Sequence, residues 1–73
     1  MPFTREQIQE IFTYHPPDSD QAVAYEKLRS AAKDFATALV ELTPPSPDQS
    51  VALRKLRECV MTANAAIALK GKF

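Results

Sequence analysis

The chain has 73 residues, a single cysteine, and nine basic residues balanced by nine acidic ones. A domain of this length buries only about 60% of its unfolded surface. We therefore expect one domain over residues 1–73 that gains stability by oligomerising. Zero net charge argues against a protein that coats DNA or RNA. The sequence has no Gly-rich phosphate loop, zinc-ligand cluster or catalytic-triad spacing, which favours a protein that is not an enzyme and has no catalytic residues, metal or cofactor.

No apolar run approaches the ~20 residues of a membrane span, and the N-terminal residues lack the apolar region of a signal peptide. The lone Cys59 lies within an apolar helical pattern and suits a reducing compartment. We therefore predict a cytoplasmic protein without membrane contact, with Cys59 in its core.

A short first helix is predicted over about residues 5–14. Thr4 is a good N-cap, and Gln7 three residues later completes a capping box. The spacing of Ile8, Ile11 and Phe12 gives one apolar face, and we assign Phe12 to the core. The adjacent prolines at 16 and 17 end the helix, because each lacks a backbone donor and disfavours helix at the preceding residue.

The elbow at residues 12–17, Phe-Thr-Tyr-His-Pro-Pro, holds Tyr14 and His15 on a stiff joint. There the two flat rings can face a ligand or a partner. The alternative is that both rings pack where the short helix folds onto the rest of the chain, as most aromatic side chains do.

Two long helices follow, over about residues 19–42 and 47–70. Asp18, Ser19 or Asp20 can cap the first. Ser46 caps the second, Gln49 is expected to complete another capping box, and Gly71 is a plausible C-terminal cap. The apolar stripes predicted to face one another are Leu28, Ala32, Phe35, Leu39 and Leu42 on one helix, and Leu53, Leu56, Val60, Ala63 and Ile67 on the other.

The short proline-rich link forces the long helices to run antiparallel, as an αα-hairpin. Residues 61–69 are apolar on more than one face, and such a helix must be buried. A hairpin this thin cannot provide that burial alone. We therefore predict an all-α fold, a short N-terminal helix followed by a long antiparallel hairpin, assembled as a compact homo-oligomer.

Candidate ligand groups lie on both long helices. Arg29 and Lys33 are spaced i, i+4 on one face, with Tyr25 one turn before Arg29. An aromatic ring near two cations could hold a nucleotide, and the alternative is a solvated helix face. Asn64 needs a hydrogen-bond partner if buried, so it could fix packing or read a ligand. We interpret Arg54, Lys55 and Arg57 mostly as solvated surface.

Three segments carry a family resemblance: FTYHPP at residues 12–17, YEKLR at 25–29 and VMTANAAIA at 60–68. Together they resemble the small phage anti-CBASS cyclic-oligonucleotide sponges, which share their helical hairpin with a phage sponge for cyclic ADP-ribose signals. The resemblance extends from about Ile11 to Lys70. One departure is Thr62, where many relatives have a tryptophan.

The resemblance implies a protein of the host cytoplasm that binds cyclic dinucleotides, and in some members cyclic trinucleotides, without cleaving them. It also implies a hexamer with dinucleotide pockets between protomers and separate trinucleotide pockets. If the site residues of the family are carried over to this sequence, Tyr14 would stack on a base, and His15 and Pro16 would line the same pocket. Arg29, or alternatively Lys33, would pair with phosphate. Polar groups of the last helix, such as Asn64, and Lys70 are candidates for the trinucleotide site.

Two other functions remain open at this point. A structural or adaptor hairpin acting only through protein contacts would account for the apolar surfaces and zero net charge without any ligand. A non-specific nucleic-acid binder is disfavoured by the charge balance.

Overall fold

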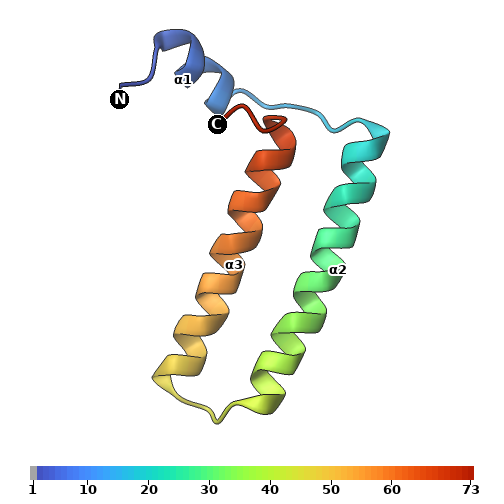
Figure 1. Ribbon diagram of the computed structural model, residues 1–73, viewed down its shortest axis with the longest axis vertical. Coiled ribbons are helices and arrows are strands. Elements are labelled where there is room, and N and C mark those ends of the chain that lie inside the picture. The colour runs from blue at the N-terminus through green and yellow to red at the C-terminus, as the bar shows by residue number, and fades with distance from the viewer. Residues whose placement is uncertain (1) are drawn as a thin grey trace.

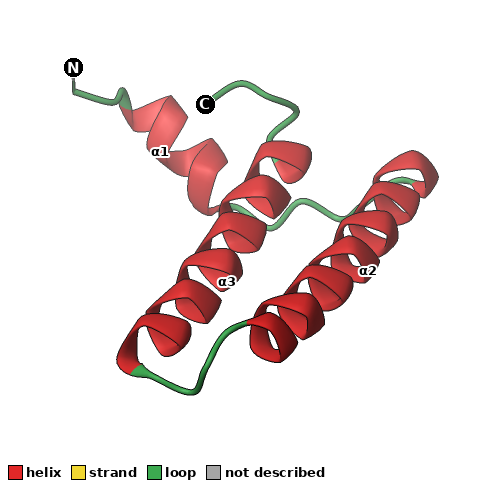
Figure 2. Ribbon diagram, turned by 60° about the horizontal axis from the view of Figure 1, so that its bottom comes forward, coloured by secondary structure: helices red, strands yellow, loops and turns green. Residues whose placement is uncertain are grey.

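The computed structural model describes residues 2–73 as three helices joined by short links (Figure 1). They are α1 (Arg5–Phe12), α2 (Ser19–Leu42) and α3 (Pro47–Ala68). Across these residues there is no strand, so the predicted all-helical fold is confirmed. The long helices α2 and α3 lie side by side as an antiparallel hairpin, and α1 lies at the end of the hairpin where the C-terminal residues emerge (Figures 1 and 2).

The first helix begins as predicted but ends early. The Thr4 hydroxyl oxygen accepts from the Gln7 backbone amide, and the Gln7 side-chain oxygen accepts from the Thr4 backbone amide, forming the expected capping box. The helix ends at Phe12 rather than residue 14, because Thr13 is already extended. Side chains take over the last carbonyls: the Thr13 hydroxyl donates to the carbonyl of Gln9. This satisfies an acceptor that the helix leaves without an amide partner.

The interface between α2 and α3 differs in part from the predicted stripes. Leu28, Ala32 and Leu39 on α2 are partly buried, but Ala36 takes the place expected for Phe35. The side chain of Phe35 is 61% exposed and that of Leu42 is 82% exposed. On α3 the partly buried residues include Leu56, Val60, Ala63 and Ile67, whereas Leu53 is exposed. Alanines and larger apolar residues thus share the partly buried interface, while other large apolar groups, such as Phe35 and Leu42, lie outside it.

Two glutamines clasp the hairpin, one at each end. Gln21, in the first turn of α2, forms a capping box with Asp18 and donates its side-chain amide to the carbonyl of Ile67 near the end of α3, at 2.9 Å. Gln49, in the first turn of α3, donates to the carbonyl of Val40 near the end of α2, at 3.3 Å, and to Thr43. The capping box predicted for Gln49 was wrong, because its amide turns to α2, although Ser46 still caps the helix through the Gln49 backbone amide.

The third helix ends at Ala68, two residues before the predicted end, in a Schellman turn. The amide of Gly71 donates to the carbonyl of Ala66, and the amide of Lys70 donates to the carbonyl of Ile67. Lys70 has φ 54° and Gly71 has φ 73°. The left-handed position that glycine usually fills is therefore occupied by Lys70, with Gly71 following it.

No residue between 2 and 73 is buried in the single chain. The molecule measures 46 × 32 × 15 Å, so it is only about as thick as one layer of helices. Cys59 and Phe12, both predicted to lie in the core, are exposed, and Met61 is 60% exposed. One chain does not cover its own apolar surface, which includes the apolar segment of α3.

Candidate functional site

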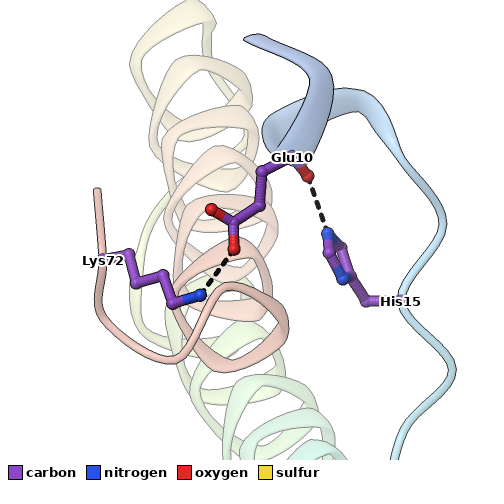
Figure 3. A network of polar contacts seen from close by, with 3 residues as sticks. All are labelled: Glu10, His15 and Lys72. Carbon is purple, nitrogen blue, oxygen red and sulfur yellow. Dashed lines mark hydrogen bonds and ion pairs between the residues drawn. The ribbon is translucent and has the colours of Figure 1, made fainter. Parts of the chain in front are cut away.

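The elbow between α1 and α2 presents Tyr14 to solvent. Its side chain is 79% exposed, and the neighbouring Pro16 and Pro17 are exposed as well. His15, in contrast, is partly buried, and its Nε2–H donates to the carbonyl of Glu10 at 2.7 Å (Figure 3). One ring of the elbow is therefore free for stacking, while the other caps the end of α1.

The C-terminal residues hold α1 from the opposite side. The Lys72 ammonium donates to the Glu10 carboxylate (Figure 3), so Glu10 is bound through both its carbonyl and its side chain. The rings of Phe3 and Phe73 lie with their centroids 6.3 Å apart and their planes tilted by 54°. Because α1 does not pack closely on α2 or α3, these contacts position the elbow.

Asn64 and Lys70 lie in the half of the hairpin nearer the elbow. Asn64 is partly buried, and its backbone carbonyl faces the hydroxyl of Tyr25 at 3.5 Å. That contact turns Tyr25 towards α3, so its ring is not the free stacking surface considered from the sequence. Lys70 is exposed in the turn after α3.

The remaining two predicted residues line a groove between α2 and α3. Arg29 and Lys33 border it on the α2 side, and Arg54 and Arg57 border it on the α3 side. We call this the hairpin groove; its volume is about 480 Å³. Its other lining residues are apolar: Ala32, Ala36, Leu53, Leu56, Val60 and Met61. It combines an apolar floor with a rim of four cations and no carboxylate.

Arg54 and Arg57 are the site candidates that sequence reasoning interpreted as solvated surface. The signal that could have found them is their spacing: residues i and i+3 share one face of a helix, whereas Lys55 between them lies about 100° away. The antiparallel pairing of α2 and α3 then brings that face beside Arg29 and Lys33.

The predicted site residues thus fall into two groups in one chain. Tyr14, His15, Pro16 and Lys70 lie at the elbow end, with Asn64 in the same half of the hairpin, whereas Arg29 and Lys33 lie at the hairpin groove. Arg29 comes ten residues after the start of α2 at Ser19, so at 1.5 Å per residue it lies about 15 Å along the helix from the elbow. One chain does not bring the Tyr14 ring next to the Arg29 guanidinium.

The described residues 2–73 contain no group of three or more His, Cys, Asp or Glu side chains placed to hold a metal ion. Their helices also include none that is both long and apolar enough to cross a membrane.

Comparison with known protein families gives a match over most of the chain. The family model described as "Acb2/Tad1, hairpin domain" matches residues 5–68, which takes in α1, α2 and α3. No curated protein and no solved structure matches the chain.

Proposed function

Because this chain belongs to the Acb2/Tad1 hairpin-domain family, we propose that it binds cyclic dinucleotide second messengers, and also cyclic trinucleotides, and holds them without cleavage. Membership of the family implies a phage anti-defence sponge, a binding protein rather than an enzyme. Sequestering the messenger in the host cytoplasm would keep the CBASS effector inactive. The observation that carries the proposal is the family match over residues 5–68.

The dinucleotide pocket is proposed to lie between two copies of the chain. Tyr14 stacks on a base, and Arg29, with Lys33 beside it, pairs with phosphate. The separation of about 15 Å between the elbow and Arg29 in one chain supports this arrangement, because a second, antiparallel copy can supply the group that the first lacks. A cyclic dinucleotide has near two-fold symmetry, which matches a self-complementary interface.

The other predicted residues are given secondary roles. His15 and Pro16 border the dinucleotide pocket, with His15 keeping its bond to α1. Asn64 and Lys70, which lie in the half of the hairpin nearer the elbow, are proposed for the separate trinucleotide pocket.

The energies of these contacts are adequate for tight binding. Stacking of a base on an aromatic ring contributes about 1–3 kcal/mol. Each charge-assisted hydrogen bond contributes about 1.5–3 kcal/mol. Two of each can approach the −12 kcal/mol or so of a nanomolar complex if the groups are held in place beforehand.

The assembly is proposed to be a homo-oligomer, a hexamer as in the family. The support is the burial pattern: within residues 2–73 no residue is buried, and the side chains of Phe35 and Leu42 are 61% and 82% exposed. Exposed apolar surfaces of this kind mark interaction sites in soluble proteins, and another copy of the same chain can cover them.

Native mass spectrometry with a panel of cyclic di- and trinucleotides tests the proposal, because it reports subunit number and bound ligand together. We expect an oligomer that retains intact cyclic nucleotide. The ligand released by heating should have the mass of the ligand added. Linear products would identify a hydrolase, and no bound ligand at all would contradict the proposal.

A structural or adaptor hairpin is the second candidate, favoured by the exposed apolar side chains alone. Such a protein would show no thermal shift with any cyclic nucleotide and would retain a defined protein partner. A thermal shift with one member of the panel excludes it.

A further inference from the structure

We propose that the hairpin groove binds the phosphates of the ligand on both of its walls, with Arg54 and Arg57 of α3 acting as ligand-binding residues alongside Arg29 and Lys33. The ligand class is an oligonucleotide with at least two phosphodiester groups. This inference rests on the proposed function and extends its site to a second helix.

The charge distribution of the groove is the first argument. Four of the nine basic residues of the chain border one groove, and none of the nine acidic residues does. Within residues 2–73 the one ion pair joins Lys72 to Glu10, so all four groove cations lack a salt-bridge partner. The groove therefore carries positive charge with no carboxylate among its lining residues, which favours an anionic ligand there.

The chemistry of the rim is the second argument. Three of its four cations are arginines, whose planar guanidinium groups donate in pairs to phosphate oxygens. Ala32 and Ala36 form part of the floor, and their small side chains leave room for a flat ring or a sugar against the helix.

A second copy of the chain is the competing occupant. Its α1 is amphipathic, about 12 Å long, and carries Glu6 and Glu10. Glu10, however, already pairs with Lys72, which leaves one free carboxylate on α1 for four cations. A phosphodiester ligand offers at least two full charges in a compact body and therefore matches the rim better.

Calorimetric titration with the cyclic dinucleotide and trinucleotide that bind the unmodified protein tests the inference. We expect Arg54→Gln and Arg57→Gln each to weaken binding about tenfold, and the double variant on the order of a hundredfold. Lys55→Gln is the matched control: it removes the same charge from the same helix outside the groove, and it should leave affinity unchanged. Arg54→Lys with Arg57→Lys should restore part of the affinity, because charge is kept and paired donation is lost.

The outcomes separate the two proposals. If the unmodified protein binds no cyclic nucleotide, the proposed function fails and this inference fails with it. If the double glutamine variant binds as tightly as the unmodified protein, this inference alone is overturned. Loss of the oligomer on native mass spectrometry, with ligand affinity per chain retained, would instead identify the groove as an interface between copies and would also overturn it.

Discussion

Lys72 donates a hydrogen bond to the carboxylate of Glu10, linking two side chains 62 positions apart in the sequence. With the ring contact between Phe3 and Phe73, this ion pair makes the C-terminal tail a clasp for α1. Because α1 does not pack closely on the long helices, the position of the elbow depends on that clasp.

Replacing Lys72 with alanine should loosen α1 without unfolding the hairpin. An exposed ion pair contributes about 1 kcal/mol or less to global stability, so the unfolding midpoint should change little. Backbone amides of residues 5–12 should exchange faster with deuterium, measured by NMR. Lys55→Ala is the control for loss of an exposed lysine, and equal exchange in the two variants would show that the clasp is unimportant.

Gln21 should contribute more to stability than its counterpart in α1. Gln21 completes a capping box and also donates to α3, whereas Gln7 completes a capping box only. We expect Gln21→Ala to cost about 1–2 kcal/mol, and Gln7→Ala less. The measurement is thermal unfolding followed by circular dichroism.

The isosteric Gln21→Glu variant separates the two roles of that side chain. It keeps an acceptor for the Asp18 amide but places a carboxylate against the Ile67 carbonyl. At neutral pH it should be destabilised at least as much as Gln21→Ala. Full stability of Gln21→Glu would mean that the bond to α3 contributes nothing.

The turn after α3 offers a stabilising substitution. A left-handed backbone costs a residue other than glycine about 1–2 kcal/mol, and Lys70 adopts it at φ 54°. Lys70→Gly should therefore raise the urea midpoint, offset in part by the greater freedom of glycine in the unfolded chain. Gly71→Ala, at φ 73° with open space around the added methyl group, should lower it. If Lys70 binds the trinucleotide, Lys70→Gly will also lower the affinity for that ligand while it increases the stability of the fold.

Phe35 should report on assembly. Its side chain is 61% exposed on the single chain, so Phe35→Glu should keep the helical content but disrupt an interface between copies. Native mass spectrometry should show smaller species for this variant. Thr37→Glu, an exposed position on the same helix, is the control. An unchanged mass for Phe35→Glu would exclude this face from the assembly.

Tyr14 should control affinity for cyclic dinucleotides. Removing a stacked ring costs about 1–3 kcal/mol per base, so Tyr14→Ala should weaken binding by at least tenfold in calorimetry, with the oligomer intact. Phe12→Ala removes an equally exposed ring two residues away and serves as the control. Undiminished affinity for Tyr14→Ala would remove it from the site.

Local signals predicted the helices well. Thr4, Asp18 and Ser46 each cap a helix, and Pro47 occupies the first position of α3. The ends of α1 and α3 were less predictable. They depend on side chains such as Thr13 and His15, and on a left-handed lysine, which compete with helical hydrogen bonds in ways that a periodic pattern does not contain.

The site was predictable only in part, for a geometric reason. Tyr14 and the pair Arg29 and Lys33 were chosen from local patterns and from the family resemblance, and their role in binding remains a prediction. The inclusion of Arg54 and Arg57 depends on which faces of α2 and α3 meet. The predicted apolar stripe assigned Phe35 to the face towards α3, whereas the neighbouring Ala36 lies there and Phe35 is exposed.

The two glutamine clasps have a consequence for the axial register of the hairpin. Two helices lined mainly by alanine and leucine could slide along one another at little cost, since their contacts are similar at successive turns. Two hydrogen bonds oppose any such slip: one from Gln21 to Ile67 at one end of the hairpin, and one from Gln49 to Val40 at the other. A shift of one residue would move each donor by about 1.5 Å from its carbonyl. The relative height of the arginines on opposite walls of the hairpin groove is thus set by two uncharged amides that do not line it.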